Sequence, residues 1–234
     1  MSPVVLWGAA GAAGALALAA RGGLDPNSRV FGPVVSRGPA GGDRVYLTFD
    51  DGPNPGATAR ILDILAEARV PAAFFLVGRH AERFPELARR VAEAGHDLGN
   101  HTYGHRKLLF AGADEIRREL GEGHRAIVAA TGTTPRLFRA PHGYRNPFVV
   151  REARLLGYTT FGWNGAVFDT ARPGAVEIRR RVARLLVPGA ILLLHDGDGA
   201  DAEGDRTQTA EALPGILDDA RCLGLRFGSL SELA

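Results

Sequence analysis

Cysteine is nearly absent from this sequence, which holds a single one, Cys222, among 234 residues. One cysteine excludes a disulfide within the chain, and it also excludes a zinc site built from several thiolates. Any metal that the protein binds must therefore be held by histidine and carboxylate side chains.

Lysine is equally scarce, because Lys107 is the only one and arginine supplies almost all of the basic charge. The formal net charge is only +2. Arginines such as Arg89, Arg90, Arg117 and Arg118 stand among acidic residues in stretches with helical spacing. Mixed charge of this kind is typical of solvated helix faces, so no nucleic-acid partner is expected.

No hydrophobic run reaches the length of about 20 apolar residues that a membrane-spanning helix needs. Val4 to Ala20 lacks charge, but it is rich in Ala and Gly. We expect residues 1–20 to be a signal peptide or a marginal membrane anchor, with a candidate cleavage site at residues 17–19. Arg21 argues for the opposite orientation, and a buried or mobile helix is the alternative. Export would place the protein in the cell envelope, secreted or membrane-anchored outside the cytoplasm.

The remaining composition, with 45% hydrophobic and 23% charged residues, is that of an ordinary globular protein. Residues 21–43 are rich in Gly, Pro and Ser and show no periodicity, which predicts a linker. Residues 44–234 are long enough for one domain with a single core.

Within residues 44–234, short apolar runs alternate with stretches of helical spacing. This alternation predicts an α/β fold with a parallel sheet, either open or closed into a barrel. The predicted strands are Val45–Phe49, Ala72–Val77, a strand that ends near Asn100, Leu137–Arg139, Tyr158–Phe161 and Ala190–Leu194, and the predicted helices are Thr58–Ala68, Pro85–Ala94 and Asp114–Ala130.

Two adjacent carboxylates, Asp50 and Asp51, follow the first predicted strand in the sequence TFDDGP (48–53). Asp-Asp-Gly-Pro by itself is equally well explained as a turn. The carboxyl ends of parallel strands are, however, where barrels and open sheets place their active sites. The two carboxylates are therefore candidates for catalysis or metal binding.

Two histidines four residues apart follow the strand near Asn100, in the sequence HTYGH (101–105). On one helical turn, His101 and His105 would share a face, and both could reach one metal at ~2.0 to 2.1 Å. Two unrelated polar histidines are the alternative. A catalytic zinc needs a third protein ligand and an open water position, and Asp51 is the natural candidate. The same ligands are compatible with iron or cobalt.

Later strand ends carry further polar residues: Arg139 in RAPHG (139–143), the stretch from Trp163 to Asp169, and His195 in LLHD (193–196). Individually, an ordinary ion pair explains Arg139, and a structural histidine explains His195. Together they fall at the edge of the sheet where the metal is expected.

In combination, TFDDGP, HTYGH, RAPHG and LLH resemble, in order, the motifs of the NodB-homology polysaccharide deacetylases, and the resemblance covers about residues 44–234. It implies a distorted (β/α) barrel and a bound divalent metal, with zinc expected first and cobalt or iron as alternatives. It also implies that the substrate is an N-acylated, above all N-acetylated, chitin-like or peptidoglycan-like glycan. We expect a monomer, with membrane association through the N-terminus.

The resemblance implies a role for each matching residue. Asp51, His101 and His105 would hold the metal. Asp50 would be the general base oriented by Arg139, and His195 would be the general acid with Asp169 as its partner. The expected substrate-binding residues are His142, through its backbone N–H, Leu193, Trp163 and Tyr144.

Two positions depart from the family pattern. His142 stands where Tyr is common, and Thr170 stands where a Trp usually follows the Asp, so Trp163 is the candidate to replace that hydrophobic wall. Two other functions fit the same motifs. One is an amidohydrolase or deformylase acting on a cyclic ureide or a lipid-linked sugar. The other is a non-catalytic glycan-binding protein, in which the base, ligands or acid would be lost.

Overall fold

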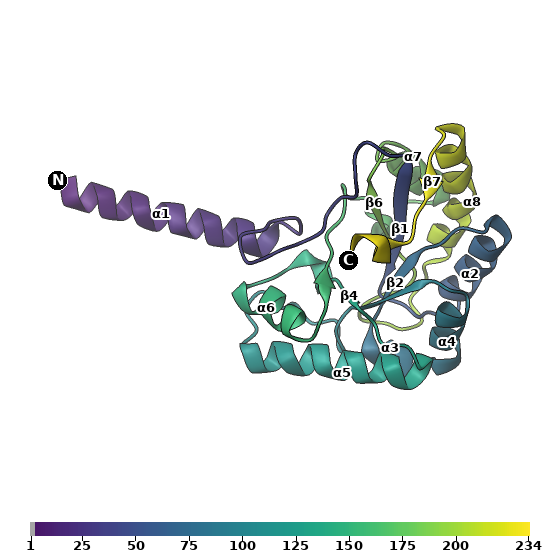
Figure 1. Cartoon of the computed structure of the whole chain (residues 1–234), viewed down its shortest axis with the longest axis horizontal. Helices are drawn as coiled ribbons and strands as arrows, with labels where there is room; N and C mark the ends of the chain where they lie inside the picture. Colours follow the sequence, from purple (N-terminus) through teal and green to yellow (C-terminus); the bar gives the residue numbers. More distant parts are fainter. Residues whose placement is uncertain (1–2) are drawn as a thin grey trace.

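One parallel sheet lies at the centre of the molecule, as the computed structural model of residues 3–234 shows (Figure 1). The strands are β1 (Arg44–Asp50), β2 (Ala73–Leu76), β3 (Asp97–Asn100), β4 (Leu137–Phe138), β5 (Thr159–Thr160), β6 (Ile191–His195) and β7 (Arg226–Phe227). Their order across the sheet is β5-β4-β3-β2-β1-β6, and β7 pairs with the start of β1. The strongly curled sheet confirms the predicted distorted (β/α) barrel.

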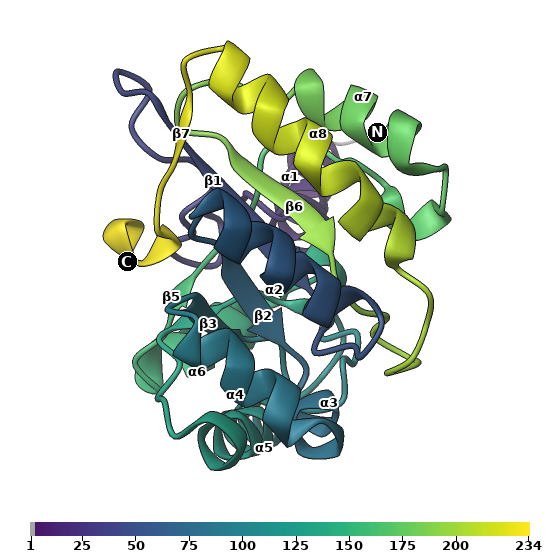
Figure 2. The same ribbon diagram turned by 90° about the vertical axis from the view of Figure 1, so that its right-hand side faces the viewer.

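Helices cover the outside of this sheet, and Figure 2 shows α2, α4 and α8 lying across it. The helices are α1 (Pro3–Leu24), α2 (Ala57–Ala68), α3 (Gly78–Arg83), α4 (Pro85–Glu93), α5 (Ala113–Thr131), α6 (Pro147–Leu155), α7 (Ala175–Ala183) and α8 (Thr207–Cys222), with short 3-10 turns at Pro141–Gly143, Asp169–Ala171 and Leu230–Leu233. Each strand and helix predicted from the sequence is present to within a few residues. Helices α3, α6, α7 and α8 and strand β7 were not predicted.

The alternation of side chains along β1 decides which groups reach the inside of the barrel. Val45, Leu47 and Phe49 point outward into the core between the sheet and the helices. Because successive side chains of a strand point to opposite faces, Thr48 and Asp50 point inward. Complete burial of each such apolar side chain contributes about 1.5–3 kcal/mol, which fixes this register of β1.

The barrel is closed between β5 and β6 by a segment that precedes β1. Val35 forms a parallel bridge with Phe161, next to β5, and Arg37 forms an antiparallel bridge with Ala190, next to β6. Val34 is buried, with 2% of its surface exposed. The structural domain therefore begins before Arg44, within the stretch that the sequence predicted to be a linker.

Helix α1 projects away from the barrel (Figure 1). Leu16 and Leu18, in its carboxyl-terminal half, are exposed to 73% and 56%. Within the described part of the chain, no helix has the length and apolarity needed to cross a membrane. The predicted boundary at residue 20 falls inside α1, four residues before the helix ends at Leu24.

Candidate active site

The carboxyl end of β1 places two carboxylates at the mouth of the barrel. Asp50 lies in register with His195, the last residue of β6. Asp51 has a left-handed backbone conformation, with φ of 76°, which turns the chain away from the strand directly after Asp50. Since the conformation is unfavourable for a residue other than glycine, the surrounding contacts must hold it. The Nδ1 atom of His80 on α3 lies 2.9 Å from the Asp51 carbonyl oxygen and supplies one of them.

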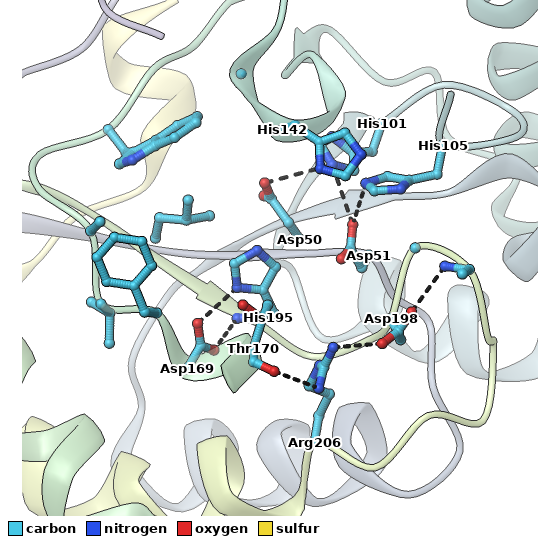
Figure 3. Close-up of a pocket in the computed structure, with 18 of the residues that line it drawn as sticks. Asp50, Asp51, His101, His105, His142, Asp169, Thr170, His195, Asp198 and Arg206 are labelled. Atoms are coloured by element: carbon cyan, nitrogen blue, oxygen red, sulfur yellow. Dashed lines mark hydrogen bonds and ion pairs between the residues drawn. The ribbon is translucent and has the colours of Figure 1, made fainter. Parts of the chain in front are cut away.

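Asp51, His101 and His105 converge as the sequence predicted (Figure 3). The Nε2 atoms of His101 and His105 lie 3.3 and 2.9 Å from Asp51 Oδ1. His101 Nδ1 lies 2.7 Å from the carbonyl oxygen of Arg139, to which it donates its proton, so Nε2 keeps its lone pair.

These three residues fit a divalent metal by their donor set. Asp51 Oδ1 is buried and accepts no hydrogen bond of normal geometry, although two imidazole nitrogens lie beside it. Nitrogen lone pairs and a carboxylate oxygen that converge in this way are satisfied by a cation. Two histidines and one carboxylate form a ligand set that leaves a coordination position for water.

The HTYGH segment brings its histidines together without the helical turn that the sequence suggested. Thr102 and His105 instead adopt left-handed conformations, with φ of 66° and 56°. Asn100 supports the segment by accepting a hydrogen bond of 2.8 Å from the Thr102 N–H. Glu119 on α5 supports it by accepting one of 2.8 Å from the Gly104 N–H. Sequence reasoning did not find Asn100 and Glu119, because their role depends on where α5 packs.

Arg139 orients the second carboxylate. Its Nη1 donates hydrogen bonds of 2.7 Å to Asp50 Oδ1 and 2.8 Å to Thr48 Oγ1, and its Nη2 donates one of 3.1 Å to the Gly162 carbonyl oxygen. The guanidinium also lies 4.2 Å from the centre of the Phe75 ring. Burial lowers the pKa of Arg139, and the charge of Asp50 opposes that effect. Arg139 thereby fixes Asp50 Oδ1, and the other carboxylate oxygen of Asp50 lies 3.7 Å from His101 Nε2.

His195 and Asp169 form the predicted acid pair on the other side of Asp50 (Figure 3). His195 Nδ1 donates to Asp169 Oδ1 at 2.8 Å, and the His195 backbone N–H donates to Oδ2 at 2.7 Å. Thr209 on α8 donates a third hydrogen bond to Asp169. Burial alone would lower the pKa of His195, but the charge of Asp169 and their hydrogen bond raise it to about 9. At neutral pH the imidazole therefore carries a proton that it can give away.

A cavity of about 620 Å³ joins the metal-ligand set to both pairs. It is lined by the predicted residues Trp163, Leu193 and His142 and by Thr170. Tyr144 does not line this cavity; its ring lies 5.7 Å from the His142 ring. Phe168, from the predicted stretch between Trp163 and Asp169, also lines the cavity. Further lining residues were not singled out from the sequence, because they come from α3 and from loops rather than from strand ends: Arg79, Lys107, Asp198 and Arg206.

His142 occupies the place where Tyr was expected. Its backbone is left-handed, with φ of 58°, and its ring lies 4.8 Å from the ring of His105. Burial, reinforced by the neighbouring His105, lowers the pKa of His142 to about 4. The ring of His142 is therefore neutral at the pH at which His195 is protonated.

Sequence relatives and structural neighbours of the chain agree with one another. Residues 37–161 match the family model described as polysaccharide deacetylase. Over 205 residues, the chain is 39% identical to a chitooligosaccharide deacetylase of Sinorhizobium fredii, covering 85% of this chain and 95% of that protein. Over 191 residues, it is 36% identical to a peptidoglycan-N-acetylglucosamine deacetylase of Bacillus cereus, covering 81% and 87%. A solved CE4 family pseudoenzyme from Bacillus anthracis matches with a TM-score of 0.78 and 31% identity, covering 86% and 68%.

Proposed function

Because the chain belongs to the polysaccharide deacetylase family of glycan N-acetyl hydrolases, we propose that it is a metal-dependent enzyme that deacetylates an amino-sugar glycan of the chitin-like or peptidoglycan-like kind. One observation carries this proposal. The Asp51–His101–His105 set, the His195–Asp169 pair and Asp50 all line one cavity, and Arg139 supports Asp50 from behind the cavity wall. A non-catalytic glycan-binding protein would not need all three.

An amide has a poorly electrophilic carbonyl and a poor leaving group, and the site supplies an answer to each difficulty. Asp51, His101 and His105 would hold the metal. Zinc is the first candidate and cobalt or iron are alternatives; such an ion polarises the carbonyl oxygen and lowers the pKa of water.

The chain's own residues carry the protons. Asp50, which Arg139 orients through a hydrogen bond to Oδ1, accepts the proton of the attacking water. His195, protonated through its interaction with Asp169, donates a proton to the departing amine nitrogen. The apolar side chains of Leu193 and Trp163 line the cavity and provide a place for the acetyl methyl group.

Removal of the metal should abolish activity, because no other group in the site can polarise the carbonyl to the same degree. The measurement is turnover of a panel of N-acetylated glycans, followed by mass spectrometry after chelation and after adding back zinc or cobalt. The mass lost by the substrate separates deacetylation from deformylation or ureide hydrolysis. Full activity in metal-free protein would contradict the proposal.

We also propose that the protein works in the cell envelope, secreted or attached to a membrane through its N-terminus. The uncharged stretch from Val4 to Ala20 supports this location. A reporter fused to residues 1–43 should leave the cytoplasm, either cleaved or tethered, and cell fractionation measures this. A reporter that stays soluble in the cytoplasm would overturn the proposal.

A further inference from the structure

The residues between α1 and β1 make contacts that reach the catalytic site. We call residues 25–37 the barrel strap. Its last residues close the barrel through Val35 and Arg37, as described above. Its first residues lie against the wall of the cavity, beside Trp163 and Gly143. Residues 25–36 precede the stretch that matches the family model.

Asn27 makes a two-point contact with Trp163. The Asn27 side-chain amide donates a hydrogen bond of 2.9 Å to the Trp163 carbonyl oxygen, and its Oδ1 accepts one of 3.1 Å from the Trp163 N–H. The Asn27 backbone is itself held, because its N–H donates to Asp25 Oδ1 at 2.9 Å. These two hydrogen bonds hold the peptide groups on both sides of the Trp163 Cα, and so they set the position and orientation of the Trp163 backbone.

The strap approaches so closely that two residues of the site must be glycine. A Cβ on Gly162 would lie 2.2 Å from Asn27 Oδ1 and 2.9 Å from the Pro26 carbonyl oxygen. A Cβ on Gly143 would lie 2.8 Å from Pro26 Cβ and 2.7 Å from the Trp163 ring. The strap therefore packs directly on the turn that carries His142.

The same contacts extend to the candidate base. The Gly162 N–H donates to the Val35 carbonyl oxygen at 2.9 Å, and the Gly162 carbonyl oxygen accepts from Arg139 Nη2 at 3.1 Å. Arg139 in turn holds Asp50. On the other side, Arg145 Nη2 donates hydrogen bonds of 2.6 Å to the Asp25 carbonyl oxygen and 3.2 Å to that of Ser28.

We propose that Asn27, at the start of the barrel strap, is a positioning residue for the catalytic site, and that it holds Trp163 as the wall of the acyl cavity. This inference rests on the proposed deacetylase function for its kinetic consequence, but the contacts do not depend on it. Thr170 stands where the family usually has a Trp, and in this proposal Trp163 takes the place of that Trp as the hydrophobic wall. The position of Trp163 then depends on residues that precede the predicted domain.

The test uses the full chain with Trp7→Phe, so that the fluorescence of Trp163 is observed alone. Asn27→Ala should shift the emission of Trp163 to longer wavelength and increase its quenching by acrylamide, because its backbone loses two hydrogen bonds. Asn27→Asp keeps the acceptor for the Trp163 N–H but loses the donor, and it should give an intermediate shift. Arg29→Ala changes an exposed strap residue and should give no shift.

The kinetic readout is the ratio of kcat/KM for N-acetyl and N-propionyl substrates. A fitted pocket discriminates one methylene by about 10- to 200-fold, so Asn27→Ala should bring this ratio several-fold closer to unity. It should also lower kcat/KM for the N-acetyl substrate by about 10- to 100-fold, because small displacements in a site are costly. Arg29→Ala should match the parent protein in both measurements.

Unchanged fluorescence and unchanged acyl selectivity in Asn27→Ala would overturn the strap proposal. A parent protein that releases acetate from no glycan would instead overturn the proposed function. The fluorescence comparison would still decide whether Asn27 positions Trp163. If Asn27→Ala fails to fold, Asn27→Asp carries the same comparison.

Discussion

Asp50→Asn should abolish turnover while the protein keeps its metal. Asparagine retains an oxygen that can accept the hydrogen bond from Arg139, but it cannot take a proton from water at neutral pH. Loss of a general base typically costs ~10² to 10⁴ in rate, and we expect a loss of at least this size. The measurement is kcat on an N-acetylated glycan together with metal content by elemental analysis.

Asp51→Ala is the matched comparison, because it changes the neighbouring carboxylate and should lose the metal. His101→Ala and His105→Ala should behave in the same way. If Asp50→Asn were fully active, the base would have to be another group. If it lost the metal, Asp50 would belong to the ligand set, a possibility that its 3.7 Å distance from His101 Nε2 makes worth measuring. The melting temperature of Asp50→Asn should also be measured, because the loss of the charge next to the buried Arg139 could destabilise the fold.

His195→Ala should keep its metal and lose about 10² to 10⁴ of its rate on an amide, because the departing amine needs a proton. An activated aryl ester has a better leaving group that departs without protonation. The same variant should therefore lose much less rate on such an ester, if the parent protein hydrolyses it. Equal losses on both substrates would make His195 a residue that positions substrate, and loss of metal would make it a ligand.

Asp169→Asn should reproduce the amide defect in a milder form, because it weakens the interaction that fixes the imidazole and raises its pKa. The sign of the pH dependence follows. A pKa raised to about 9 keeps His195 protonated at neutral pH, so activity should fall as the pH rises through about 9.

In Asp169→Asn the alkaline fall should occur at lower pH than in the parent protein. A bound cation lowers the pKa of His195 in both proteins. The prediction therefore concerns the difference between the two pH profiles of kcat/KM, and not the absolute pH of either alkaline limit. Identical alkaline limits in the two proteins would contradict the assignment of the acid to this pair.

The strands were predictable because a strand that is buried on both faces has an unbroken run of apolar residues in the sequence, as in Ala190–Leu194. Helices α7 and α8 show a weaker pattern in the sequence. Helix α7 buries only Ile178 and Val182, and α8 contains Pro214 in its interior. Both helices are stabilised by packing against each other and against the sheet. The short-range periodicity of the sequence gives no information about such tertiary contacts.

The chemistry of the site was also largely present in the sequence. Asp50, Asp51, His101 and His195 stand directly at or after strand ends, and parallel strands bring such ends to one edge. What the sequence suggested incorrectly was the local path of the HTYGH segment. Left-handed conformations at Thr102 and His105 are rare for residues other than glycine, and the segment is held by the neighbouring Asn100 and, from further along the chain, by Glu119.

By itself, then, the sequence determined the parallel-sheet fold class and the set of candidate residues for proton transfer and metal binding. Only the tertiary structure decided how the barrel closes and what holds the acyl cavity. Asn27 and Trp163 are separated by 136 positions. Residues 25–37 have the composition of a linker, because a strap that is held by backbone hydrogen bonds and by close approach to glycines needs no apolar periodicity.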